Sequence, residues 1–319
     1  MSYKITAKKT PSLSLITSLP EDVIIDILAR VPRCDYPKIS LVSKHFQSLV
    51  ASPELYVRRS LLNCTEHCLY AVLFNYETKD SHLYILRRKP NCNRCLVLIP
   101  SLPVIPWGVS FVTVGSRIYV FGGNDKKYIE ASIDCISHTK MMMVFNTETQ
   151  MWEPEIIKMD TELISINCFY WVVMADKLFT RDLYNSFAYE PTKSKWKMDD
   201  MLNSKVWRSA CVVDDVLYYY DGDENKIRAY DPKQKCWSVV KGLEKLLPET
   251  IDPWWSETVS YGGKLTLFFR KVEMQTSEIW CAEIALERRQ GGEIWGKVEW
   301  CDHLLTGNFH LRKPLAVVV

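Results

Sequence analysis

A phrase of eight residues occurs three times in this chain of 319 residues. It reads FNTETQMW at 145–152, YEPTKSKW at 189–196 and YDPKQKCW at 230–237, so each copy joins an aromatic residue, a polar middle and a closing tryptophan. Glu190-Pro191 and Asp231-Pro232 favour a turn, because proline presets φ at the second turn position. The phrase therefore predicts a turn between two strands, and its aromatic residues are most simply packing residues of a repeated unit.

A second element repeats in the same order along the chain. A polar turn followed by a short apolar strand occurs at 114–123, 174–182, 213–222 and 261–269. A looser fifth unit runs from Ile279 to Leu286 and, after an insertion, reaches Trp295. Four strands per period of roughly 40 to 50 residues are typical of the blades of a β-propeller. The sequence predicts about five blades, or six if the segment 300–312 contains further strands.

The first blade lacks one strand. Residues 69–74, 83–87 and 96–99 supply three apolar strands, whereas LAVVV at 315–319 is a strand without a neighbour in the sequence. Pairing this last strand with the first blade would close the ring and remove exposed sheet edges. We therefore expect the C-terminal strand to complete the first blade.

The chain before residue 65 has a different pattern, which predicts three short helices. The first begins after Pro20 and continues through Val31 with aliphatic residues at helical spacing. A second follows Pro37, and a third begins where Ser52, a capping residue, precedes Pro53. Three such helices are too few to bury all their aliphatic side chains, so part of that surface is expected to bind a partner.

Composition sets further bounds on the class of protein. The net charge of +2 gives no electrostatic field that favours nucleic acid. The basic residues Lys4, Lys8 and Lys9 predict a flexible arm over 1–14, and no apolar signal-peptide core follows them. The longest apolar runs are too short to span a membrane. The 11 cysteines are scattered among apolar neighbours, which favours reduced thiols in the cytoplasm or nucleus.

Two families are now recognisable in these patterns. The segment LPEDVIIDILARVPRCDYPKISLVSKHFQSLVASPELY at 19–56 is similar to an F-box, with Phe46 where many F-boxes carry tryptophan. The repeated turn, apolar strand, tyrosine and tryptophan resemble the kelch repeat, although Gly122-Gly123 is the only intact glycine pair. The chain thus resembles the plant F-box/kelch-repeat proteins. This implies a small all-α F-box over 15–64 and an all-β kelch-type propeller over 65–319.

The resemblance implies that the F-box docks on the Skp-family adaptor of a ubiquitin ligase, and through it reaches the cullin and RING subunits. It also implies that the propeller binds an unknown target protein, and that the chain is a non-catalytic subunit without a cofactor. The residues carried over for adaptor binding are Leu19, Pro20, Val23, Ile27, Leu28, Val31, Pro32, Leu41, Val42, Phe46 and Leu49. The helix-packing role of some of them stays open.

Strand counting predicts which face of the propeller binds the target. The chain enters the first blade beside the end of the C-terminal strand, so the connections after the second strand of each blade lie on the opposite face. We expect this opposite face to bind the target, with the loop 124–140 as a place for specificity. Its candidate residues are Trp107, Arg181, Trp207, Arg208, Asp223, Trp254, Trp255 and Arg270. Packing is an open alternative for the tryptophans.

The sequence patterns that could indicate catalysis or metal binding are weaker. One signal is a set of paired cysteines at zinc-like spacing, namely Cys64, Cys68, Cys92 and Cys95. The segment VGSRIY at 114–119 indicates a hairpin rather than a phosphate-binding loop. We expect the six histidines mostly in outer loops and helices, away from any metal centre near the axis. The sequence therefore predicts neither catalytic residues nor a metal.

Two classes of function remain. The first is the substrate-recognition subunit of a ubiquitin ligase, which raises the effective concentration of target lysines near the transferring enzyme. The second is a kelch scaffold that acts outside a ligase. Cullin in the adaptor complex would distinguish them.

Overall fold

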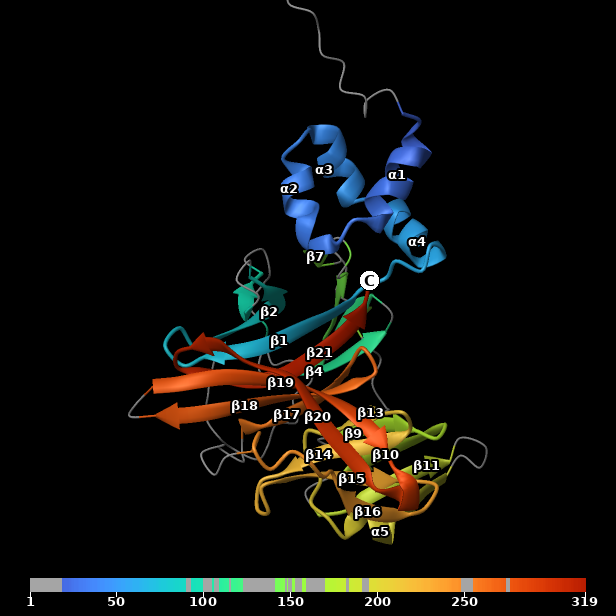
Figure 1. The fold of residues 1–319 in the computed structure, drawn as a ribbon, viewed down its shortest axis with the longest axis vertical. Coiled ribbons are helices and arrows are strands. Elements are labelled where there is room, and N and C mark those ends of the chain that lie inside the picture. The colour runs from blue at the N-terminus through green and yellow to red at the C-terminus, as the bar shows by residue number, and fades with distance from the viewer. Residues whose placement is uncertain are drawn as a thin grey trace, which may run out of the picture. The chain divides into compact units, whose positions relative to one another are not determined.

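The computed structural model describes residues 19–89, 93–99, 105, 109–114, 116–122, 141–146, 148, 151–152, 157–158, 170–181, 184–190, 195–247, 255–273 and 276–319. The chain divides into two compact units, Met1–Glu66 with Val319 and His67–Val318 (Figure 1). The predicted arm at 1–14 lies outside the described residues. In the part of the chain that the structure describes, no helix has the length and apolar character needed to cross a membrane.

The described part of the first unit contains four α-helices and one 3-10 turn. They are α1 (Glu21–Arg30), η2 (Arg33–Asp35), α2 (Tyr36–Ser40), α3 (Lys44–Val50) and α4 (Pro53–Leu61). Three helices were predicted, and the difference lies in the second one, which is divided at Ser43. The Ser43 backbone is extended, and its hydroxyl accepts a hydrogen bond from the Phe46 N–H at 3.1 Å. Ser43 thereby caps a new helix, as Ser52 caps α4.

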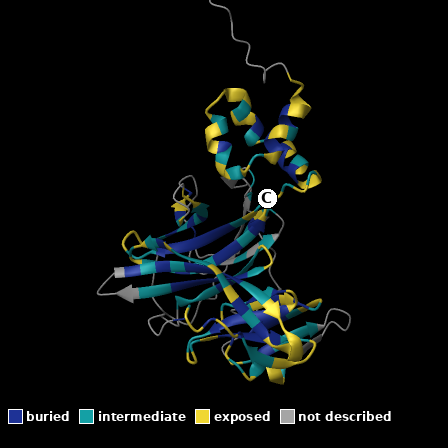
Figure 2. Cartoon of the chain, in the orientation of Figure 1, coloured by how far each residue is buried: buried dark blue, intermediate teal, exposed yellow. Residues whose placement is uncertain are grey.

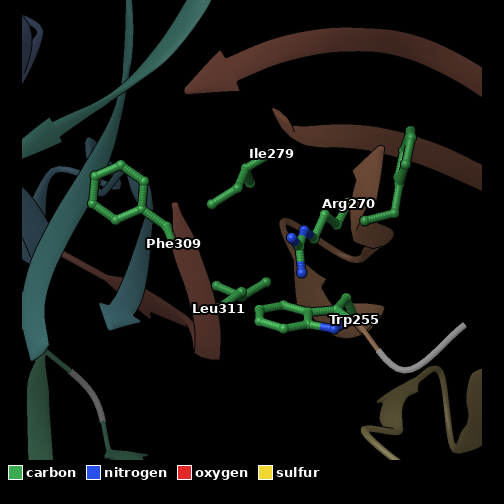
Figure 3. A pocket seen from close by; sticks show the side chains of 6 residues that line it. Trp255, Arg270, Ile279, Phe309 and Leu311 are labelled. Atoms are coloured by element: carbon green, nitrogen blue, oxygen red, sulfur yellow. The ribbon is translucent and has the colours of Figure 1, made fainter. Parts of the chain in front are cut away.

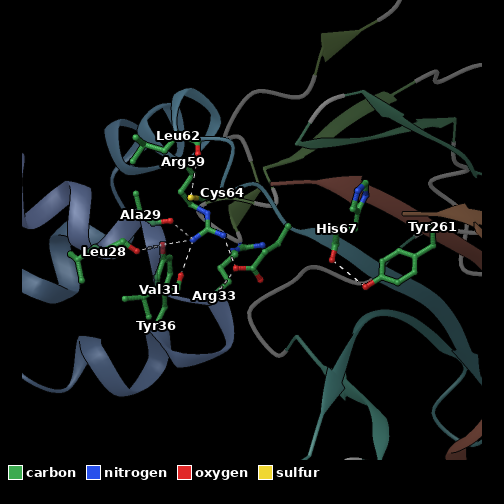
Figure 4. Close-up of polar contacts among 11 residues, drawn as sticks. Leu28, Ala29, Val31, Arg33, Tyr36, Arg59, Leu62, Cys64, His67 and Tyr261 are labelled. Atoms are coloured by element: carbon green, nitrogen blue, oxygen red, sulfur yellow. Dashed lines mark hydrogen bonds and ion pairs between the residues drawn. The ribbon is translucent and has the colours of Figure 1, made fainter. Parts of the chain in front are cut away.

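The core of the helical unit is apolar except for one arginine. Its buried apolar residues are Ile24, Ile25, Leu28, Ala29, Tyr36, Leu49, Leu55 and Tyr56. Arg59 on α4 is also buried, with 1 % of its surface exposed. Its guanidinium donates to the carbonyl oxygens of Ala29 and Val31 at 3.0 and 2.9 Å (Figure 4).

The same guanidinium has two further partners. It donates to the Tyr36 hydroxyl at 2.9 Å and pairs with the Glu66 carboxylate at 2.5 Å. The Tyr36 hydroxyl in turn donates to the Leu28 carbonyl at 3.0 Å. Arg59 thus ties α4 to the end of α1 and to the start of α2, where the last carbonyls of α1 need donors.

The second unit is a β-propeller, and its described residues form five sheets. Blade 1 contains β21 (Phe309–Val318), β1 (His67–Asn75), β2 (Asp80–Arg88) and β3 (Arg94–Leu98). Blade 2 contains β4 (Val109–Val114), β5 (Arg117–Gly122), β6 (Met141–Asn146), β7 (Met151–Trp152) and β8 (Ile157–Lys158). Blade 3 contains β9 (Tyr170–Met174), β10 (Lys177–Arg181), β11 (Ser186–Glu190) and β12 (Lys195–Met198).

The last two blades have the same order of strands. Blade 4 contains β13 (Cys211–Val213), β14 (Val216–Asp221), β15 (Lys226–Asp231) and β16 (Cys236–Val239). Blade 5 contains β17 (Glu257–Tyr261), β18 (Lys264–Glu273), β19 (Thr276–Arg288) and β20 (Ile294–Thr306). Short helices α5 (Asp200–Asn203) and η5 (Gln290–Gly292) lie in the connections. The prediction of about five blades agrees with these five sheets.

The repeated phrase is the hairpin between the third and fourth strands. Its first and last residues lie directly opposite each other, as Phe145 opposite Trp152, Tyr189 opposite Trp196 and Tyr230 opposite Trp237. In blade 4 the two rings lie 5.0 Å apart, and Tyr230 is 1 % exposed. Cross-strand aromatic pairs stabilise antiparallel sheets. The predicted turn is therefore confirmed, and in blade 4 the aromatic residues pack against each other.

The turn after the innermost strand has a tight geometry in blades 3 to 5. Both central residues have positive φ, as in Asp214 (49°) and Asp215 (61°) of blade 4 and Gly262 (59°) and Gly263 (74°) of blade 5. Two-residue hairpins with positive φ at both positions match the twist of the strands they join. This explains why the second repeated element has polar or glycine residues at its turn.

The C-terminal strand closes the propeller as predicted. β21 pairs with β1 in antiparallel register, from His67 opposite Val318 to Asn75 opposite Phe309. β21 is thus the innermost strand of blade 1 and takes the place that the first strand has in the other blades. All five innermost strands line one central cavity of about 270 Å³. Figure 2 shows buried residues along the strands and exposed residues mainly in the loops and on the helices.

Candidate functional sites

The helical unit has an apolar surface that its own helices leave exposed. We define the aliphatic surface as five exposed residues, namely Leu19, Val23, Ile27, Leu41 and Val42. Leu41 and Val42, which follow α2, are 86 % and 70 % exposed. Ile27 on α1 is 50 % exposed, although isoleucine is among the residues most often buried. Exposed apolar groups of this kind are a common feature of protein-binding surfaces.

The other residues predicted to bind an adaptor fall into two groups. Pro20 and Pro32 are exposed, and Val31 and Phe46 are partly buried, so all four are accessible. Leu28 and Leu49 are 4 % and 5 % exposed and belong to the helical core. Because their side chains are turned inward, the structure gives them a packing role instead. The sequence could not separate the two groups, since both follow the same helical spacing.

Two exposed residues of α4 were not among the predicted set. Val57 is 60 % exposed and Leu61 is 68 % exposed. They are four residues apart and so lie on one side of the helix. This spacing is visible in the sequence and could have indicated that both side chains lie on the same side of the helix.

Two of the predicted target-binding residues are buried. Trp207 is 0 % exposed and donates from its indole N–H to the Ser186 hydroxyl at 3.0 Å. Arg181 is 3 % exposed and donates to the same hydroxyl at 2.9 Å and to the Lys205 carbonyl at 3.1 Å. Trp207 packs with Tyr219 and other residues of blades 3 and 4. Both residues therefore hold blades together, and a target cannot reach them in this structure.

The remaining target-binding candidates lie in different surroundings. Arg208 and Asp223 are exposed. Trp107, Trp254 and the loop 124–140 lie outside the described residues. Trp255 and Arg270 are partly buried and contact each other, with the guanidinium carbon 4.2 Å from the centre of a Trp255 ring. Of the predicted set, Trp255 and Arg270 are the two that the structure brings into direct contact at an accessible position.

Two neighbouring innermost strands share a charged pair at the cavity. The Lys313 ammonium of β21 lies 3.5 Å from the Glu257 carboxylate of β17, which also accepts a hydrogen bond from the Ser209 hydroxyl. The Glu257 side chain is 15 % exposed. Burial raises the pKa of Glu257, and the nearby Lys313 only partly offsets this effect. No sequence pattern indicates this pair, because the two residues are far apart in the chain.

The structure describes no metal centre. Among the described residues, no group of three or more His, Cys, Asp or Glu side chains could hold a metal ion. Of the cysteines with zinc-like spacing, Cys64, Cys68 and Cys95 are in the reduced form, and Cys92 lies outside the described residues. The expectation that the histidines lie mostly in loops and helices was wrong. Four of them lie in strands, namely His67, His82, His303 and His310.

Two family models match this chain. Residues 16–58 match the F-box domain, and residues 137–305 match the FKB95, Kelch-repeats domain. The match to the F-box coincides with the helical unit and the aliphatic surface, and the kelch match lies within the propeller. A helical F-box unit followed by a kelch propeller is the class of protein that the two units define.

Relatives over the full length belong to the same class. F-box/kelch-repeat protein At4g38940 of Arabidopsis thaliana is 46 % identical over 357 residues, covering 96 % of this chain and 95 % of the relative. F-box/kelch-repeat protein At4g39240 is 35 % identical and covers 96 % and 90 %, and putative F-box/kelch-repeat protein At3g10510 is 37 % identical and covers 98 % of both. Both are also from Arabidopsis thaliana. The chain belongs to the F-box/kelch-repeat protein family, which confirms the resemblance found in its sequence.

Proposed function

We propose that this chain is the substrate-recognition subunit of a Skp-cullin-F-box ubiquitin ligase. In this proposal the helical unit binds a Skp-family adaptor, and the propeller binds the protein to be ubiquitinated. The chain supplies no catalytic group of its own. It accelerates transfer by holding target lysines at high effective concentration near the ubiquitin-loaded enzyme.

The aliphatic surface of the helical unit is the observation on which the proposal depends. Leu41 and Val42 are almost fully exposed, and they lie in the segment that matches the F-box. Burying a leucine or valine side chain against a partner contributes about 1.5–3 kcal/mol. Exposed aliphatic residues at helical spacing are the usual anchors by which one helical unit packs on another.

Co-purification with a Skp-family adaptor and cullin tests the proposal. The native chain is compared with Leu41→Glu/Val42→Glu, which places two carboxylates at the two most exposed residues of the aliphatic surface. The matched control is Leu98→Glu, which makes the same kind of change at an exposed residue of the propeller, 42 % exposed. We expect the native chain and the control to capture adaptor and cullin, and the double variant to capture neither.

Other outcomes have defined meanings. Capture of the adaptor without cullin would replace the ligase proposal with the scaffold function. Equal capture by the double variant, with circular dichroism showing a folded chain, would remove the aliphatic surface as the docking site.

A further inference from the structure

The central cavity of the propeller has room for a small molecule. Its volume of about 270 Å³ is close to the lower end of the range of about 300–1,000 Å³ that ligand pockets occupy. The hollow lined by Trp255, Arg270, Ile279, Phe309 and Leu311 has, by contrast, no space for a water molecule (Figure 3). Of these two places in the described part of the propeller, the central cavity is therefore the one that can hold a ligand.

The wall of the central cavity on blades 2 and 3 presents apolar side chains. Trp171 and Val173 of β9 line the cavity and are 43 % and 65 % exposed, although both residue types are usually buried. Phe111 of β4 lines the same cavity. Because aromatic rings pack well against one another, this wall suits a ligand with a flat aromatic body.

A single cation lines the cavity among the residues that the structure describes. Lys313 of β21 is a lining residue, whereas its partner Glu257 is not. The Glu257 carboxylate, 3.5 Å away, is the one described partner of the Lys313 ammonium, and an ammonium group can donate to several acceptors. Thr113 and Ser260 add hydroxyl groups to the lining. The cavity therefore combines an apolar wall with donors for an anionic group.

The charges near this part of the cavity are mostly positive. Burial raises the pKa of Tyr170 at the start of β9, and Glu257 raises it further. Arg208 and Arg181 act on the same group in the opposite direction, so both cations lie near it. Together with Lys313, these charged groups are three cations and one carboxylate. Such a balance favours an anionic ligand.

We propose that the central cavity binds a small aromatic carboxylic acid. The aromatic body of the ligand lies against Trp171 and Phe111, and its carboxylate accepts hydrogen bonds from the Lys313 ammonium. One lining cation matches the single charge of a carboxylate, whereas a phosphate monoester carries a charge of about −1.5 to −2. This ligand-binding function goes beyond the proposed binding of an adaptor and a target protein.

Isothermal titration calorimetry of the purified full-length chain with benzoate, cinnamate and 2-naphthoate tests the proposal. We expect at least one of these acids to bind with a Kd below about 1 mM. The corresponding neutral amide has the same aromatic body without the charge. It should bind about 10-fold or more weakly, because a hydrogen bond to a charged group contributes more than one between neutral groups.

A double variant tests the role of the cation. Glu257→Gln/Lys313→Met removes the lining ammonium together with its carboxylate, so that neither charge is left buried alone. We expect it to bind the acid about 10-fold or more weakly than the native chain. The matched control is Glu283→Gln/Lys264→Met, which should bind as the native chain does. The Lys264–Glu283 pair of blade 5 has a distance of 2.8 Å and a similar exposure, and neither residue lines the cavity.

A second pair of variants leaves Lys313 and Glu257 in place. Val173→Asp and Val173→Asn have nearly the same shape and differ in the charge that they place on the cavity wall. A carboxylate there repels an anionic ligand, so we expect Val173→Asp to lose affinity for the acid relative to Val173→Asn. Equal affinities of these two variants would overturn the proposal.

Three further results would also overturn it. They are no binding of any of the three acids, equal binding of the acid and its amide, and equal effects of the two double variants. All four variants change residues of the propeller alone, so their capture of the adaptor should equal that of the native chain. Failure of the native chain to capture adaptor would refute the ligase function and would leave the ligand proposal unaffected.

Discussion

Replacing Arg59 by methionine should destabilise the helical unit. Although Arg59 is not part of the aliphatic surface, the proposed capture of the adaptor should then be lost. Methionine keeps much of the length of the side chain but has no donor. The change leaves the Ala29 and Val31 carbonyls, the Tyr36 hydroxyl and the Glu66 carboxylate without the donor they share. Breaking a buried ionic network by removing one partner costs about 3–5 kcal/mol.

This cost is large in comparison with the stability of so small a unit. Folded domains have about 0.05–0.15 kcal/mol of stability per residue, which gives roughly 2–7 kcal/mol for a unit of this size. The loss of the Arg59 network therefore removes most of the stability of the helical unit. Because the aliphatic surface exists only when α1 to α4 are packed, adaptor binding should be lost with it.

Limited proteolysis and adaptor capture at 25 °C measure the effect. We expect Arg59→Met to be cut within residues 19–66 while the propeller stays intact, and to capture no adaptor. Arg58→Met is the matched control on the same helix, because Arg58 pairs with Asp26 at the surface, where their side chains are 43 % and 29 % exposed. Surface pairs contribute little, so the control should resist proteolysis and bind adaptor.

The reasoning would be refuted if Arg59→Met resisted proteolysis as well as Arg58→Met did. That result would show that methionine packing replaces the network, as apolar residues replace some buried ion pairs in other proteins.

Four further predictions concern the propeller. The pKa of Glu257 is raised in the folded chain, so its protonated carboxyl contributes stability at acid pH that is lost as the pH rises through the folded pKa. The melting temperature of Glu257→Gln, relative to that of the native chain, should therefore increase between pH 4 and pH 7. A difference between the two melting temperatures that does not change with pH would contradict this. Lys313→Met should instead lower the melting temperature at pH 7, because it leaves Glu257 buried without its cation. Trp207→Ala should cost about 3–5 kcal/mol in urea unfolding, whereas a loss below about 1 kcal/mol would contradict its burial. Gly242→Ala should also lower the melting temperature, because φ is +82° there and a Cβ would lie 2.9 Å from the Gly296 carbonyl oxygen.

The sequence was most informative where a pattern repeats. The paired aromatic residues at the ends of the repeated phrase predicted the hairpins, and the register places Tyr230 opposite Trp237 as expected. The lone strand at the C-terminus predicted the closure, because an incomplete blade and an unpaired strand complete each other. Both predictions depend on main-chain pairing, which is specified by alternation and turn chemistry over short distances.

The sequence was less informative about which side chains are buried and which are exposed. Leu28 and Leu41 both follow the apolar spacing of the F-box, yet Leu28 is 4 % exposed and Leu41 is 86 % exposed. The difference arises from the break at Ser43, which begins a new helix and leaves the preceding turn in solvent. His310 is in a strand that pairs across the closed ring, so its neighbours come from residues far away in the chain.

Trp207 and Trp255 show how two tryptophans at similar positions of a degenerate repeat come to have different surroundings. Each precedes the innermost strand of its blade, so their positions in the repeat do not separate them. The Trp207 indole N–H donates a hydrogen bond to Ser186, and the ring lies within the core between two blades. A partner therefore cannot contact this side chain. Trp255 has its ring covered by Arg270, a cation whose charge no described carboxylate neutralises. In this fold the partners of the ring, rather than its place in the repeat, therefore decide whether a tryptophan belongs to the core between two blades.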